Sequence, residues 1–185
     1  MESRSGGGST RERGAHFRDA LLLDVLERFA IRSIVDAPCG DFNWMRNVVG
    51  ERHAYTGIDI VEDLIAANRE QHGNANRQFL CGDLTRGSFP KADLILCRDC
   101  LMYFSYVDIC AAISNFKRSG AKYVLTTTFP GTDSRDIRTG GWRPLDLQAP
   151  PFDFPPPVAT IGEVPAGLQH DYPDKKLCLW ERASL

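Results

Sequence analysis

The chain has 185 residues, of which 43% are hydrophobic and 25% are charged, and its formal net charge is −2. These values are typical of a soluble globular protein and predict a single domain over residues 1–185 with a substantial core. The near-neutral charge and the lack of a long apolar run argue against nucleic-acid partners, membrane partners and a secretory leader, and they leave the oligomeric state open.

The first residues are rich in serine and glycine. Residues 1–10 are typical of a flexible tail, with a lid that folds over a bound ligand as the alternative. Apolar residues at positions i, i+3, i+4 and i+7 then indicate an amphipathic helix within residues 11–29. These residues are Leu22, Val25, Leu26 and Phe29. We expect this helix to pack against the edge of a sheet.

Residues 33–44 predict a strand, a tight loop and the start of a helix. A short run with two β-branched residues ends in Asp36 and continues into Pro38 and Gly40. In open α/β sheets this arrangement holds a nucleotide-like ligand, because loop and helix N–H groups point into the crevice. The dinucleotide fingerprint G-x-G-x-x-G is absent, and Pro38 has no N–H for a pyrophosphate. An ordinary buried strand with a Pro-Gly turn is the alternative. A short helix over 43–49 should follow.

Residues 55–60 predict the second strand, which carries an acidic residue near its end. Asp59 stands about 20 residues beyond the loop, where an acidic residue binds ribose hydroxyls in this architecture. A carboxylate accepts hydrogen bonds from both hydroxyls of a cis-diol, which explains the residue type. The alternative is that Asp59 caps the helix expected over 61–72. The register favours the ribose role, and both roles are compatible.

Three further strands alternate with helical patterns. Residues 77–84, 92–97 and 122–129 predict the third, fourth and fifth strands, the last of them by its β-branched content. Before the fifth strand, Ser105 and Asp108 stand at the spacing of a capping box and predict the start of a helix. Strands that alternate with helices require right-handed crossovers and a parallel sheet.

The segment over residues 130–157 has no helical period and consists of turn formers, charges and prolines. A loop of this length in a compact domain is usually functional or disordered, and its aromatic residues argue against disorder. We therefore assign it to substrate recognition through Trp142 and Arg143, with a core-sealing role as the alternative for Trp142. The planar fork of Arg143 can pair with a carboxylate or phosphate, which makes an acidic substrate group plausible.

The six cysteines indicate reduced thiols and a cytoplasmic protein. Most of them lie in apolar runs, where cysteine behaves as a small buried hydrophobe. Cys97 and Cys100 form a C-x-x-C motif, but no second pair stands at zinc-ligand spacing, so no metal is expected. A redox pair is also disfavoured, because this motif ends an apolar run instead of opening a helix.

Two segments resemble motifs of the class I S-adenosylmethionine-dependent methyltransferases. The first motif of that family reads acidic-x-G-x-G-x-G, and Asp36 and Gly40 occupy matching places, while Pro38 and Phe42 replace the first and third glycines. The segment around Asp83 resembles the one whose acidic residue binds the adenine amino group. The sequences over 36–44 and 142–145 resemble those of a small branch of the family. This resemblance does not indicate a substrate.

The resemblance implies an α/β fold, namely a Rossmann-like, doubly wound and mostly parallel sheet of about seven strands. The closing pair would be residues 158–161 and 176–181, with the last strand antiparallel. S-adenosylmethionine would be the cofactor, with Asp59 on the ribose, Asp83 on the adenine and the N–H of Leu84 directed to the ring. The full set of implied cofactor residues is Asp36, Pro38, Gly40, Trp44, Asp59, Ile60, Asp83, Leu84 and Arg98.

The resemblance implies methyl transfer to a small molecule. Asp99 is the candidate for orienting or deprotonating the nucleophile, and a loop carboxylate paired with Arg98 is the alternative. The segment Asn/Asp-Pro-Pro-aromatic is missing after the fourth strand, which disfavours methylation of nucleic-acid bases. A catalytically inactive binding module is the alternative function, suggested by Pro38 and Phe42. A nicotinamide-dependent oxidoreductase is disfavoured by the missing glycines.

Overall fold

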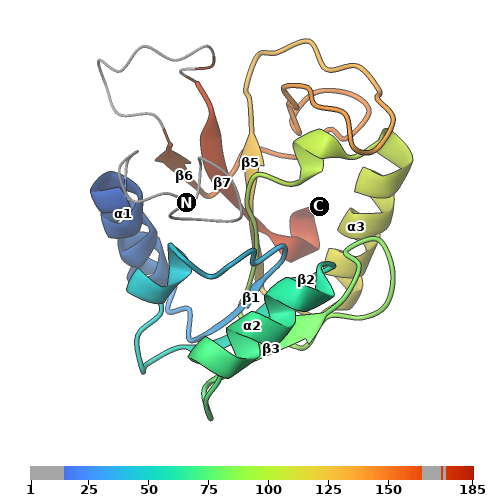
Figure 1. Ribbon diagram of the computed structural model, residues 1–185. Helices are drawn as coiled ribbons and strands as arrows, with labels where there is room; N and C mark the ends of the chain where they lie inside the picture. Colours follow the sequence, from blue (N-terminus) through green and yellow to red (C-terminus); the bar gives the residue numbers. More distant parts are fainter. Residues whose placement is uncertain (1–14, 164–171, 173) are drawn as a thin grey trace.

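The computed structural model describes residues 15–163, 172 and 174–185, so the expected tail over 1–10 lies outside the described residues. Seven strands form a sheet of order β3-β2-β1-β4-β5-β7-β6 (Figure 1). They are β1 (Ser33–Asp36), β2 (Ala54–Asp59), β3 (Arg77–Cys81), β4 (Leu94–Cys97), β5 (Tyr123–Thr128), β6 (Ala159–Gly162) and β7 (Lys176–Glu181). Strands β1 to β5 pair in parallel, whereas β7 is antiparallel to β5 and to β6. The expected Rossmann-like sheet is confirmed.

Helices cover the two faces of the sheet. Helices α1 (Ala15–Arg28) and α2 (Glu62–His72) pack on one face, and α3 (Tyr106–Arg118) packs on the other (Figure 1). The alternation of side chains in β1 supplies both cores, because Ile34 packs with the first pair of helices and Val35 packs with α3. None of the helices in the described ranges is long and apolar enough to cross a bilayer.

The helix expected over 43–49 is only a single 3₁₀ turn, Met45–Asn47. The side chain of Asp41 accepts a hydrogen bond from the N–H of Asn43 at 3.3 Å, which forms a turn that competes with a regular helix start. Two β-branched valines then precede Gly50, and such residues propagate a helix poorly. This prediction of a helix was therefore wrong in extent.

The long segment over 130–157 contains no helix, and three of its apolar side chains lie in the core. Leu145, Leu147 and Phe154 are buried against the same face of the sheet as α3. The N–H of Phe129 donates to the carbonyl of Leu145 at 2.9 Å, and the indole N–H of Trp180 donates to Pro155 at 2.7 Å. The segment thus covers sheet surface that a crossover helix would otherwise bury.

The same segment completes the N-terminus of α3. Ser105 accepts from the N–H of Asp108 at 3.2 Å, as the capping box predicts. The return bond runs through Thr139, whose hydroxyl accepts from the N–H of Ser105 and donates to the carboxylate of Asp108. Asp136 accepts from the N–H of Tyr106 at 2.7 Å. Figure 1 shows this orange segment beside the start of the yellow helix α3.

Candidate functional site

The polar residues singled out in the sequence gather at one edge of the sheet. Strands β1 to β4 run parallel, so their carboxyl ends lie together, and Asp36, Asp59, Asp83 and Arg98 stand at or just beyond those ends. The strand order reverses between β1 and β4. In open α/β sheets, the crevice for a ligand forms at this reversal.

The loop after β1 is fastened to β2 by its own N–H groups. The N–H of Cys39 donates to the carbonyl of Ile58 at 2.9 Å, and the N–H of Gly40 donates to Oδ2 of Asp59 at 3.0 Å. Oδ1 of Asp59 accepts from the N–H of Val61, also at 3.0 Å, just before α2 begins. The carboxylate of Asp59 therefore joins the loop to the end of β2, and the two loop N–H groups do not face the crevice.

Phe42 occupies the place of a glycine without filling the crevice. Its backbone adopts a φ of 56°, and its ring is completely buried. The ring packs against Tyr55 and Phe79, with centroids 4.9 and 5.3 Å away. A left-handed backbone directs this side chain into the core on the α2 face. The bulk of Phe42 therefore gives no steric argument that the protein is an inactive binding module. Pro38 follows a cis peptide bond.

Asp36 is buried at the end of β1. Its Oδ2 accepts a hydrogen bond from the hydroxyl of Tyr55 at 2.7 Å. Burial raises the pKa of Asp36 to about 7, although the bond from Tyr55 and the charge of Arg98 act in the opposite direction. This carboxyl group therefore exchanges its proton near neutral pH.

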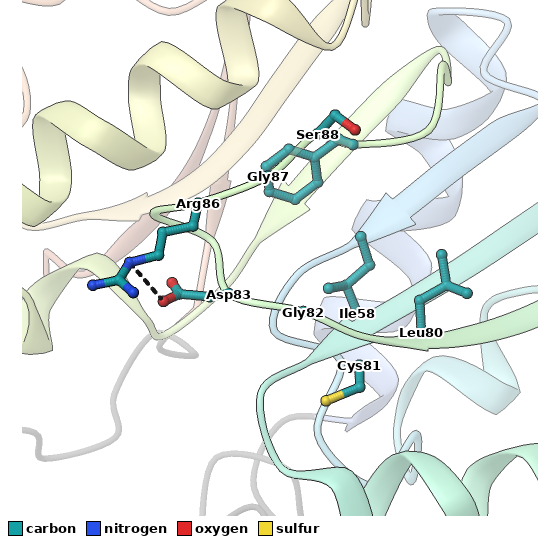
Figure 2. A pocket seen from close by; sticks show the side chains of 9 residues that line it. Ile58, Leu80, Cys81, Gly82, Asp83, Arg86, Gly87 and Ser88 are labelled. Atoms are coloured by element: carbon teal, nitrogen blue, oxygen red, sulfur yellow. Dashed lines mark ion pairs between the residues drawn. The ribbon is translucent and has the colours of Figure 1, made fainter.

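A pocket of about 340 Å³ lies beside Asp83. Figure 2 shows Asp83 paired with Arg86 at one end and the apolar side chains of Ile58 and Leu80 at the other. The Oδ2 of Asp83 lies 3.9 Å from Nε of Arg86. Its Oδ1 accepts from the N–H and the hydroxyl of Thr85 at 2.8 and 2.7 Å. The position of Asp83 is thus set by the loop, while a third of its side chain is exposed.

The two apolar cofactor candidates behave differently. Ile60, directly after Asp59, is 65% exposed and offers an apolar surface at the edge. Leu84 is buried, and its carbonyl accepts from the side-chain amide of Asn115 at 2.7 Å. Asn115 of α3 thereby holds the loop that carries Asp83.

Four charged side chains form a compact cluster. Two of them directly follow β4, one directly follows β6, and one directly precedes β7. Nε of Arg98 lies 2.6 Å from Oε1 of Glu163, and its Nη2 lies 3.1 Å from Oδ2 of Asp99. Nζ of Lys175 lies 2.5 Å from Oδ1 of Asp99 and 3.1 Å from Oε2 of Glu163. We call these residues the charge cluster. The guanidinium of Arg98 also lies over the ring of Trp44, 5.3 Å from its centroid.

The cluster keeps Asp99 ionised. Burial alone would raise its pKa, but the cations of Arg98 and Lys175 hold the pKa of Asp99 below its usual value. Its backbone has a φ of 51°, and its N–H donates to the hydroxyl of Thr127 at 2.9 Å. A low pKa makes Asp99 a weak base, whereas a fixed carboxylate is well suited to accept a hydrogen bond from a substrate.

The neighbours Trp142 and Arg143 have different environments. Trp142 is 43% exposed and packs against Phe129 and Tyr172. Arg143 is only 3% exposed, and its Nη1 donates to the carbonyl of Met102 at 2.9 Å. Its guanidinium also lies over the ring of Tyr106. This burial argues against direct contact between Arg143 and an acidic substrate. Arg143 instead ties the long segment to the 3₁₀ turn after β4, Leu101–Tyr103.

Sequence reasoning missed several residues of the site. Glu163 and Lys175 lie just outside the closing strands expected over 158–161 and 176–181, and the sequence gives no sign that they pair with Arg98. Asn68 falls on the apolar face of the helix expected over 61–72, and a polar residue at such a buried position is a signal of a specific role. In the described part of the chain, no three His, Cys, Asp or Glu side chains gather as a metal site requires. Cys97 and Cys100 are free thiols.

Comparison with known proteins gives one match to a family model and several matches to solved structures. Residues 34–121 match the family model described as "Methyltransferase domain". N-methyltransferase NodS from Bradyrhizobium japonicum WM9 is similar at 17% identity and a TM-score of 0.64, over 92% of this chain and 97% of NodS. A TehB-like SAM-dependent methyltransferase from Corynebacterium glutamicum is similar at 16% identity and a TM-score of 0.59, over 89% and 87%.

A third solved structure, DesVI from Streptomyces venezuelae, is similar at 17% identity and a TM-score of 0.54. The match covers 67% of this chain and only 56% of DesVI. No curated protein sequence matches the chain significantly. At these identities, the solved structures establish the likeness of the fold.

Proposed function

Because this chain belongs to the class I S-adenosylmethionine-dependent methyltransferases, we propose that it methylates a small molecule held at the carboxyl edge of β4 and β5. Its cofactor is S-adenosylmethionine, which supplies when bound a methyl group made electrophilic by a sulfonium. The acceptor and the individual site residues are our assignment. The observation that carries the proposal is the placement of Asp59 between the β1 loop and the end of β2.

The residues present fit this cofactor. Asp59 is 7% exposed, and each of its carboxylate oxygens accepts one hydrogen bond from a backbone N–H. Each carboxylate oxygen can accept two such bonds, so both retain a lone pair for the hydroxyls of a ribose. Ile60 next to it offers an exposed apolar surface to an adenine ring, and Asp83 stands beside a pocket at the end of β3.

The charge cluster supports the position of the acceptor. Asp99 is the most exposed member of the cluster, with 27% of its side chain accessible, and two cations keep it ionised. We assign to Asp99 the role of accepting a hydrogen bond from the nucleophile and orienting it. Methyl transfer is an in-line displacement, so holding the nucleophile in line contributes more than moving its proton. Trp142 packs against Phe129, directly after β5, and adds an exposed ring near the carboxyl end of that strand, against which a substrate can pack.

Titration calorimetry with S-adenosylhomocysteine tests the cofactor site. Asp59→Ala removes the acceptor for the ribose and should weaken binding by about 1.5–3 kcal/mol, the scale of hydrogen bonds to a charged group. Asp59→Asn keeps one acceptor oxygen and should fall between the wild type and Asp59→Ala. NAD serves as the control ligand and should not bind.

A screen for methyl-donor turnover tests catalysis separately. The wild type should convert S-adenosylmethionine to S-adenosylhomocysteine in the presence of an acceptor from a small-molecule library. Tight binding of S-adenosylhomocysteine without turnover on any acceptor class would reject the catalytic proposal. Unchanged affinity in Asp59→Ala would reject the ribose assignment.

A further inference from the structure

Asn68 is a polar side chain buried in the apolar face of α2. It is 3% exposed and belongs to the helix face that packs on the sheet beside Ile65. Burying an amide costs free energy unless its groups are hydrogen-bonded, and a leucine at this position would suit the pattern of the helix better. The position therefore requires a specific partner for the amide.

That partner is the loop that approaches the cofactor site. Nδ2 of Asn68 donates to the carbonyl of Gly40 at 2.8 Å, and it lies 4.0 Å from the sulfur of Cys39. On the other side of the same residue, the N–H of Gly40 donates to Asp59 at 3.0 Å. Gly40 is thus held at both of its peptide groups, once from α2 and once from β2.

Two such bonds fix both backbone dihedrals of Gly40. The bond from its N–H orients the preceding peptide plane and so restricts φ, while the bond to its carbonyl orients the following plane and restricts ψ. Gly40 has a φ of 56°, a conformation that glycine reaches freely but also leaves freely. Without the bond from Asn68, the following plane would be free to rotate, and the loop would lose its single shape.

We propose that Asn68 is a positioning residue for cofactor binding, which acts through Gly40 on the carboxylate of Asp59. The inference deepens the proposed function and rests on it. The N–H of Gly40 holds Oδ2 of Asp59, so a loop held in one conformation also holds this carboxylate in one orientation. The carboxylate of Asp59 is then already oriented before the ribose binds, so binding does not pay the entropy cost of ordering this carboxylate.

Substitution of Asn68 separates this role from simple packing. Asn68→Ala removes the donor and should weaken S-adenosylhomocysteine at least tenfold in calorimetry. Ile65→Val is the matched control, because Ile65 is completely buried one turn earlier on the same helix and its aliphatic side chain cannot donate a hydrogen bond to the loop. Ile65→Val should lower the melting temperature and leave the affinity within twofold of the wild type.

Asn68→Asp gives a signature that packing does not produce. A protonated carboxyl group at this place can donate to the carbonyl of Gly40, whereas an ionised one cannot donate and repels that oxygen. The Cys39 thiol lies next to the position, and the carboxyl groups of Asp36, Asp41 and Asp59 lie close enough to act on that thiol. Arg69 and His72 follow on α2. Burial at this position and the negative charges of Asp41 and Asp59 favour the protonated form, which brings its titration toward neutral pH.

The affinity ratio of wild type to Asn68→Asp should therefore rise at least fivefold between pH 5.5 and pH 8.5. Taking the ratio at each pH removes the pH dependence that the two proteins share. A ratio that stays constant with pH, or an Asn68→Ala variant that binds like Ile65→Val, would overturn the proposal. If the wild type itself does not bind S-adenosylhomocysteine, the proposed function fails instead, so the two failures are distinct.

Discussion

The hydroxyl of Tyr55 donates a hydrogen bond to Oδ2 of Asp36 across 2.7 Å, and both side chains are almost completely buried. Tyr55 lies in β2, and Asp36 ends the neighbouring strand β1. The bond gives the buried carboxyl group one partner, yet burial still raises the pKa of Asp36 to about 7. The folded protein therefore holds a proton that the unfolded chain releases near pH 4.

Asp36 should make the unfolding free energy depend on pH. Its pKa is higher in the folded state, so its stabilising contribution is complete below about pH 4 and is lost as the pH rises through about 7. The loss is about 1.4 kcal/mol for each pH unit across that window. Asp36→Asn is neutral and keeps an acceptor for Tyr55, so it should be at least as stable as the wild type at pH 8.

Urea denaturation of both proteins at pH 5 and pH 8 measures this effect. The difference between wild type and Asp36→Asn isolates Asp36 from the histidines and other groups that titrate in the same range. The variant should lose less stability than the wild type between the two pH values. Parallel pH profiles would show that Asp36 does not carry the raised pKa.

Asp83 should contribute to cofactor affinity through its side chain. Its Oδ1 already accepts two bonds from Thr85, and Asp83→Asn retains that oxygen, whereas Asp83→Ala loses it. We expect the alanine variant to bind S-adenosylhomocysteine about tenfold more weakly and the asparagine variant to lose less.

Thr85→Val is the control for this comparison. It removes the hydroxyl bond to Asp83 but leaves the N–H bond, so it reports how much the shape of the loop matters. Calorimetry on the three variants gives the order of affinities. Equal losses in Asp83→Asn and Asp83→Ala would exclude a side-chain hydrogen bond to adenine.

Arg143 and Trp142 should affect different properties although they are adjacent. Arg143→Ala leaves the carbonyl of Met102 without its side-chain donor and should lower the free energy of unfolding by about 1–3 kcal/mol. Trp142→Ala removes a ring that is 43% exposed, so it should reduce turnover more than stability. Thermal melts and turnover with the acceptor found by screening give the two readouts. A wild-type melting temperature in Arg143→Ala would refute the structural role.

The sheet could be predicted from the sequence because each strand carries a local signal. Runs such as the one before Asp36 and the one over 122–129 are β-branched and end at turn formers. The spacing from the first loop to Asp59 also placed that residue correctly at the end of β2. The extent of the turn after Phe42 was missed, because a side chain bonded to a nearby N–H changes the helix start without altering the hydrophobic pattern.

The candidate site was less predictable because its partners are far apart in the sequence. Glu163 meets Arg98 across 65 residues, and no local pattern links them. Residue type alone suggested that Arg143 binds a substrate, whereas its side chain is buried and its Nη1 donates to the carbonyl of Met102. A buried asparagine in a helix stripe, such as Asn68, signals a partner but does not name it.

The sequence match to the methyltransferase domain ends at residue 121, but α3 obtains part of its N-terminal cap from Asp136 and Thr139. During synthesis, this helix leaves the ribosome well before the residues that complete its cap. A fragment cut at residue 121 would hold the whole of α3 and leave the N–H groups of Ser105 and Tyr106 without these partners. The cooperative folding unit therefore extends beyond the boundary that sequence similarity draws.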